Sequence, residues 1–105
     1  MVDAKTIARA VEVLRKAARP ERIILFGSHA SGRARADSDV DFLVIERRVR
    51  NVVAEMVRLR RLLSPLRIPV AVVVVSARQF AEWSDTPGNV LHAAVVEGKV
   101  VYEAA

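Results

Sequence analysis

The sequence predicts a single α/β domain of α+β type over residues 1–105, with a small mixed β-sheet flanked by helices. Segments with apolar residues at helical spacing alternate with short apolar runs that are typical of buried strands. The 105 residues suit one domain, because a single hydrophobic core takes roughly 100 to 200 residues. Hydrophobic residues make up 52% of the chain and are spread along it, which excludes a disordered tail.

Residues that cap helices stand before several of the helical segments. Asp3 precedes a segment with helical apolar spacing, Ser76 and Gln79 have capping-box spacing, and Asn89 can cap a last helix that ends at Gly98. In the central helix one side is apolar and is expected to pack: Val52, Val53, Met56, Leu59 and Leu63. The expected order is helix, strand, strand, helix, strand, helix, helix, strand, over residues 3–18, 22–26, 40–45, 51–64, 70–75, 76–83, 89–98 and 99–102.

The strands are expected to differ in their places in the sheet. Residues 70–75 form an unbroken apolar run rich in valine, which is typical of a strand covered on both faces, so we expect a central strand there. Residues 99–102 are expected to form an edge strand. Residues 27–38 are rich in Gly, Ser and charge and form a connection, in which one helical turn starts after Ser28.

Composition limits the classes of partner and compartment. The net charge is +5, carried by fourteen arginines and three lysines, which suits phosphate-rich partners or an acidic protein surface. No recognition motif for DNA or RNA accompanies this charge, so a nucleic-acid partner ranks last. The chain has no cysteine, no apolar run of the roughly 20 residues that a membrane span needs, and no signal-peptide pattern. We expect a cytoplasmic protein without disulfides, and a homo-oligomer is possible for so small a chain.

Asp39 and Asp41 form a D-x-D pair at the start of the second predicted strand. Side chains two residues apart on a strand point to the same face, so the two carboxylates project together while Val40 enters the core. Neighbouring carboxylates raise each other's pKa unless a cation lies between them, and Mg²⁺ prefers such oxygen donors. On its own, a D-x-D pattern at the start of a strand is more often a solvated turn than a metal site. The neighbouring residues must decide between the two.

Gly27 and Ser28 close the preceding strand. A Gly-Ser turn that enters a helix offers backbone N–H groups, a hydroxyl and a helix N-terminus to phosphate oxygens. The alternative is an ordinary turn that ends a strand. Together with the D-x-D pair, the turn is a far more specific signal.

This combination resembles a known family. Gly27-Ser28, ten residues, then Asp39-Val40-Asp41 resembles the G-S-x₁₀-D-x-D signature of minimal nucleotidyltransferases (MNT) in the DNA polymerase beta superfamily, including the antitoxin half of HEPN/MNT modules. The surrounding "RIILFGSHASGRARADSDVDFLVIE" is similar to that family's core. The later "PVAVVVVSARQF" and "VLHAAVVEGKVVYE" are similar to its third strand and C-terminal segment, so the resemblance covers nearly the whole chain.

The resemblance implies a nucleotidyltransferase fold, an activity and a set of roles. Gly27 and Ser28 would hold the phosphates of a nucleoside triphosphate, and Asp39 and Asp41 would hold catalytic Mg²⁺. The implied reaction transfers a nucleotidyl group, AMP where the triphosphate is ATP, to a protein acceptor. The implied partner is a HEPN ribonuclease toxin, for which this chain would be the antitoxin.

The sequence departs from the family's pattern at one position. The family usually supplies a third carboxylate from the neighbouring strand, where this chain has Ala71. Glu46 cannot replace it, because strand alternation puts Glu46 on the face opposite Asp39 and Asp41, and Asp37 lies in the loop. The alternative to an active enzyme is therefore a catalytically impaired nucleotide-binding protein of the same fold, which neutralises its partner by contact.

Other polar or aromatic residues carry weaker expectations. Arg33 and Arg35 can contact a triphosphate or remain solvated. His29 follows the Gly-Ser turn and can contact a phosphate, but it is expected instead to face solvent in its loop. His92 is expected to have a structural role inside a helix. Trp83 is expected in the core or at an interface.

Overall fold

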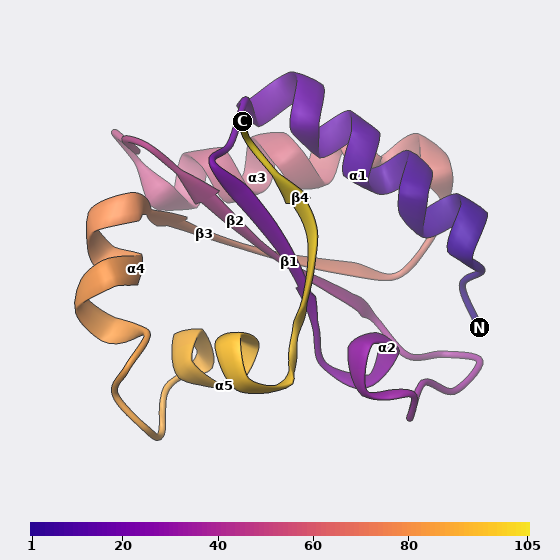
Figure 1. Ribbon diagram of the computed structural model, residues 1–105. Coiled ribbons are helices and arrows are strands. Elements are labelled where there is room, and N and C mark those ends of the chain that lie inside the picture. Colours follow the sequence, from indigo (N-terminus) through magenta and orange to yellow (C-terminus); the bar gives the residue numbers. More distant parts are fainter.

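The computed structural model describes all 105 residues and contains a four-stranded sheet with helices on both faces (Figure 1). The order of elements agrees with the predicted order. The helical turn predicted after Ser28 is present and starts at Ser28 itself, and a short 3₁₀ helix is added. No helix has the length and apolarity to cross a membrane. The elements are α1 (Ala4–Ala18), β1 (Arg22–Phe26), α2 (Ser28–Ser31), β2 (Val40–Glu46), α3 (Val52–Leu63), η1 (Ser64–Leu66), β3 (Val70–Ser76), α4 (Ala77–Trp83), α5 (Val90–Glu97) and β4 (Lys99–Glu103).

Side-chain caps start four of the helices. The side-chain oxygens of Asp3, Asn51, Ser76 and Asn89 each accept a hydrogen bond from the backbone N–H three residues further on, at 2.8, 3.0, 3.1 and 3.0 Å. Each cap satisfies one of the N–H groups that a helix start leaves without a partner inside the helix. The capping residues expected from the sequence are thus confirmed.

The sheet is mixed, as predicted, in the order β3-β2-β1-β4. β1 pairs antiparallel with both β2 and β4, and β2 pairs parallel with β3. The expected edge position of β4 is confirmed, but the expectation that β3 is central is wrong, since β3 forms the other edge. Its apolar run reflects helices on both faces of the sheet, and burial of two faces does not require a strand along both edges.

Alternation along β2 divides the core into two clusters. Val40, Phe42 and Val44 point toward α1 and α3, whereas Leu43 and Ile45 point toward α5, and all five are buried. Figure 1 shows α1 and α3 on one side of the sheet and α4 and α5 on the other. Asp41 belongs to the second set by parity, so the core on both faces fixes the strand that carries it.

The helical side chains of His92, Trp83 and Val53 can be compared with what the sequence predicts for them. His92 has the expected structural role, because its Nδ1 lies 3.0 Å from the carbonyl oxygen of Ser84 and ties α5 to the end of α4. Trp83 is 53% exposed, so it is not a core residue, and its place at an interface stays a prediction. The expectation that Val53 packs with the apolar side of α3 is wrong, because Val53 is 70% exposed and lines an open hollow beside β3.

Glu46 ends β2 on the α3 side of the sheet, opposite in parity to Asp41, as predicted. It is 9% exposed, and its Oε2 has no hydrogen-bond partner. Burial, together with hydrogen bonding and charge repulsion from Glu55, raises the pKa of Glu46 to about 8. Glu55 is itself held by Arg58, whose Nε and Nη2 donate to the two carboxylate oxygens at 2.7 and 2.9 Å.

This buried carboxyl group predicts a pH-dependent stability. The folded pKa of Glu46 lies near 8 and the unfolded value near 4.5, so the folded state holds the extra proton between these values. Stability from this group is present below about pH 4.5 and is lost as the pH rises toward 8. Glu46→Gln keeps a donor toward Glu55 and removes the titration. It should therefore raise the Tm at pH 8, by about 4–8 °C for each kcal/mol recovered in a domain of this size.

Thermal unfolding at pH 5 and pH 8 checks this expectation. The Tm difference between Glu46→Gln and wild type should be small at pH 5 and larger at pH 8. Glu21→Gln, at an exposed glutamate, is the matched control and should show no such trend. An equal Tm difference at both pH values would contradict the proton-linked explanation.

Candidate functional site

Gly27 makes the turn between β1 and α2. Its φ of 72° and ψ of −155° lie in a region that L side chains rarely adopt, so glycine suits this position. Its carbonyl accepts hydrogen bonds from the N–H groups of Ala30 and Ser31, both at 3.1 Å, which starts the short helix. The first N–H groups of a helix have no acceptor within it, and here they follow directly after Gly27.

The carboxylate of Asp41 packs against this turn. In the antiparallel ladder Phe26 is paired with Asp41, which brings the end of β1 beside the start of β2. A Cβ atom added to Gly27 would overlap the Oδ2 atom of Asp41. The position therefore requires glycine for two reasons, the positive φ and the close approach of the Asp41 carboxylate.

Asp39 and Asp41 come together as predicted. Asp39 is the exposed residue that precedes β2, and Asp41 is half-buried as its second residue. Burial raises the pKa of Asp41, and the negative charge of Asp39 raises it further, while His29 acts in the opposite direction. The pair is thus close enough to interact through its charges, and a cation between the carboxylates would relieve the repulsion.

His29 stabilises the loop that leads to the carboxylate pair. The expectation that it faces solvent is wrong, because the side chain is half-buried and its Nε2 lies 3.2 Å from the carbonyl oxygen of Ser38. Ser38 in turn accepts a hydrogen bond from the N–H of Arg35 through its Oγ, at 2.7 Å. These contacts fix the residue directly before Asp39. Arg33 and Arg35 are exposed and form no ion pair, so their contact with a triphosphate stays a prediction.

Ala71 is the residue for which the family resemblance implies a third carboxylate. It is paired with Asp41 in the parallel ladder between β2 and β3, so both side chains share one face. No group of three His, Cys, Asp or Glu side chains is arranged to hold a metal ion. The residues present still fit a hard divalent cation, because the Asp41 carboxylate lies against the Gly27 turn and Asp39 is close enough for its charge to raise the pKa of Asp41.

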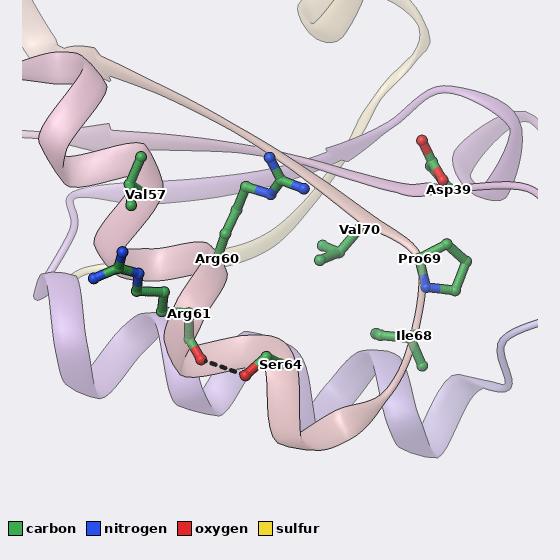
Figure 2. Close-up of a pocket in the computed structure, with 8 residues that line it drawn as sticks. All are labelled: Asp39, Val57, Arg60, Arg61, Ser64, Ile68, Pro69 and Val70. Atoms are coloured by element: carbon green, nitrogen blue, oxygen red, sulfur yellow. Dashed lines mark hydrogen bonds between the residues drawn. The ribbon is translucent and has the colours of Figure 1, made fainter.

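A groove of about 500 Å³ begins beside Asp39 and runs between α3 and the start of β3 (Figure 2). Figure 2 shows Arg60 extending from α3 toward β3, with Asp39 at the far end of the groove. No short motif in the sequence marks this groove, because its residues meet only after folding. Its lining residues are Asp39, Val57, Arg60, Arg61, Ser64, Ile68, Pro69 and Val70.

Comparisons with solved structures support the same fold. A toxin–antitoxin complex with AMP-PNP matches with a TM-score of 0.65 and 23% identity, over 98% of this chain and 75% of that chain. An MNT antitoxin complex with tri-AMPylated HEPN toxin from Shewanella oneidensis matches with a TM-score of 0.62 and 22% identity, over 95% and 71%. A mutant of the MntA–HpeT toxin–antitoxin complex matches with a TM-score of 0.65 and 24% identity, over 98% of this chain and 75% of that chain.

Sequence comparison identifies the family. A search of curated proteins found no significant match. The family described as polymerase beta nucleotidyltransferases matches residues 9–105, which include the Gly27 turn, both aspartates and all four strands. The chain therefore belongs to the polymerase beta nucleotidyltransferase family.

Proposed function

We propose that this protein binds Mg²⁺ and ATP and transfers AMP to a hydroxyl group of a partner protein, as the antitoxin of a HEPN-type toxin. The observation that carries the proposal is the approach of the Asp41 carboxylate to the Gly27 turn, with Asp39 beside it. The structurally similar proteins add support, since one contains AMP-PNP and another an AMPylated HEPN toxin. The absence of cysteine agrees with a cytoplasmic site of action.

The proposed roles follow from the chemistry of each group. The N–H groups after Gly27 and the Ser28 hydroxyl would donate hydrogen bonds to the triphosphate, and Asp39 and Asp41 would ligate Mg²⁺. The metal would neutralise the triphosphate and stabilise the departing pyrophosphate as the acceptor oxygen bonds to the α-phosphorus. Gly27 and Asp41 would thereby hold phosphate and metal on adjacent strands.

A second candidate function rests on Ala71. Ala71 is paired with Asp41, and a carboxylate there could act as a third metal ligand, whereas alanine provides no oxygen donor. A protein without this ligand can retain nucleotide binding, lose transfer, and neutralise its partner by contact. The intact mass of a co-purified partner, with and without ATP and Mg²⁺, separates the two functions. An AMP adduct supports transfer, and an unchanged mass supports neutralisation by contact.

Removing either carboxylate should weaken the binding of Mg²⁺ and ATP. Asp39→Asn and Asp41→Asn should each raise the Kd by at least about tenfold, since each removes a charged ligand. The apo protein should melt at the same or a higher temperature, because the repulsion that raises the pKa of Asp41 is relieved. Calorimetric titration checks the affinity. Asp37→Asn, an exposed acid of the same loop, is the control; equal losses in all three variants would contradict the metal assignment.

Gly27→Ala should affect both stability and nucleotide affinity. The added Cβ would displace Asp41 as well as strain the backbone. Gly32→Ala is the matched control, because Gly32 also has a positive φ, of 78°, but has open space around it. The control should lose only about 1–2 kcal/mol of stability for the left-handed backbone, with unchanged ATP affinity. If Gly27→Ala binds Mg²⁺ and ATP as tightly as Gly32→Ala does, the proposed phosphate turn is wrong.

Ala71→Asp should create the missing ligand. The new carboxylate would lie beside Asp41 and lower the apo Tm by charge repulsion. Mg²⁺ should reverse this loss, since a ligand at about 100 times its Kd stabilises the folded state by ~2.7 kcal/mol. Melting with and without Mg²⁺ should show a larger metal-induced rise than in wild type, and transfer to a true acceptor should be faster.

Val73→Asp is the control for this experiment. Val73 lies two residues along the same face of β3, beside Leu43 in the ladder and away from Asp41. Its Tm should fall equally with and without Mg²⁺. The same Mg²⁺-independent fall in Ala71→Asp would refute the proposed ligand position.

A further inference from the structure

The carboxylate pair has the Gly27 turn on one side and a groove on the other. β1 and the Gly27 turn lie on one side of β2, and β3 lies on the other. A triphosphate held by the turn would thus occupy the β1 side, which leaves the β3 side for an acceptor. The groove that reaches Asp39 is on this second side and includes Val70 and Arg60.

The start of β3 offers backbone groups to a further strand. The N–H of Val40 donates to the carbonyl of Pro69 at 2.9 Å, and Val40 is paired with Val70. In a parallel ladder alternate residues direct both backbone groups to the same neighbour, so Ala71 bonds toward β2 and Val70 and Val72 direct theirs outward. No strand of this chain pairs with that edge. Among the outward-directed residues, Val70 is half-buried, Val72 is 6% exposed and Val74 is 1% exposed, so the accessible stretch is the start of β3.

An apolar wall from α3 accompanies this edge. Val53 and Val57 are 70% and 44% exposed, and both line a hollow together with Val70, Ala71 and Asp39. Exposed valines beside unpaired strand groups suit an extended segment that places alternate side chains against the wall.

The positive charges of Arg60 and Arg61 in the groove favour an acidic segment over a second copy of this chain. Arg60 and Arg61 line it, both are exposed, and neither forms an ion pair within the chain. A second copy of this chain would bring the same arginines to the interface and be repelled, whereas an acidic segment would be attracted. The whole chain carries a net charge of +5, which also disfavours self-association.

We infer that the edge of β3 at Val70–Val72 and the groove between α3 and β3 bind an extended segment of the acceptor protein as an added strand, whose side chains facing α3 include both apolar and acidic residues. Its apolar side chains contact Val53 and Val57, and its acids, on the same face of the strand, pair with Arg60 and Arg61. Such a strand ends beside Asp39, where its hydroxyl group would meet the nucleotide. This inference rests on the proposed function for the identity of the occupant, but its test needs neither ATP nor Mg²⁺.

Fluorescently labelled eight-residue peptides provide the probe. In one, valine and glutamate take turns at every second position, with threonine between them and a tyrosine at one end, so that both side-chain types lie on one face of the strand. The other has lysine in place of glutamate. Wild type should bind the acidic peptide saturably and prefer it to the basic one. Arg60→Glu should weaken binding of the acidic peptide by about fivefold and reverse the preference, because one attraction becomes a repulsion. Arg9→Glu, at an exposed position on α1, makes the same change in net charge and should leave both affinities within about twofold.

Amide exchange distinguishes strand addition from looser contact. With the acidic peptide bound, exchange of the outward Val72 amide should slow by at least about tenfold, while that of Ala71, already bonded to β2, should change little. The inference is overturned if wild type fails to bind the acidic peptide, if Arg9→Glu loses as much affinity as Arg60→Glu, or if the Val72 amide is unaffected. Sedimentation that shows a dimer dissociated by the peptide would assign the edge to a second copy instead. If the protein binds the acidic peptide but does not bind Mg²⁺ and ATP, the proposed function is refuted and the inference about the edge of β3 stands.

Discussion

The contact between Asp41 and the backbone of Gly27 is the constraint on which the candidate site depends. It brings a carboxylate against a turn so closely that any side chain on Gly27 would overlap it. The antiparallel pairing of β1 with β2 sets this distance, and the burial of β2 on both faces fixes the pairing. A one-residue slip would turn Asp41 into the α3 side of the core and Phe42 out of it, so the hydrophobic pattern of β2 also specifies the position of the carboxylate.

Two carboxyl groups of β2 illustrate how position determines what a raised pKa means. Burial raises the pKa of both Asp41 and Glu46. Asp41 lies at an accessible end of the strand beside Asp39, where a cation from solution can compensate the charge. Glu46 lies at the other end, buried against α3, where Glu55 and Arg58 already form an ion pair. The first group is therefore suited to ligand binding, and the second affects mainly the stability of the fold.

The sequence predicted those features that depend on local chemistry. Helix starts followed from side chains such as Asp3 and Asn89, and the opposite faces of Glu46 and Asp41 followed from strand alternation. Features that depend on the order of strands were not predictable in this way. The valines of β3 indicated burial of both faces, but they carry no information about which edge remains open.

Contacts between segments that are separated in the sequence also explain why the surroundings of His29 and Arg60 could not be predicted. His29 was expected to face solvent because a loop sequence does not reveal that residue 38, at the far end of the loop, returns to accept its hydrogen bond. The groove beside Asp39 joins α3 to the start of β3, which are separated in the chain by η1 and a loop, so no spacing rule could identify Arg60 as a neighbour of the site. Only the carboxylate pair and the glycine turn, each local in sequence, could be recognised before folding.

The position of Ala71 allows binding and transfer to be separated. The Gly27 turn, which would hold the phosphates in the proposed function, lies on the β1 side of Asp41, and Ala71 lies on the β3 side, so an alanine at position 71 leaves the turn unchanged. What it removes is a charge at the position where an acceptor would approach. A small apolar residue there also lowers the repulsion that an acidic acceptor segment would meet, because two negative charges remain instead of three. In the proposed function, alanine at position 71 thus removes a metal ligand and at the same time favours contact with an acidic partner.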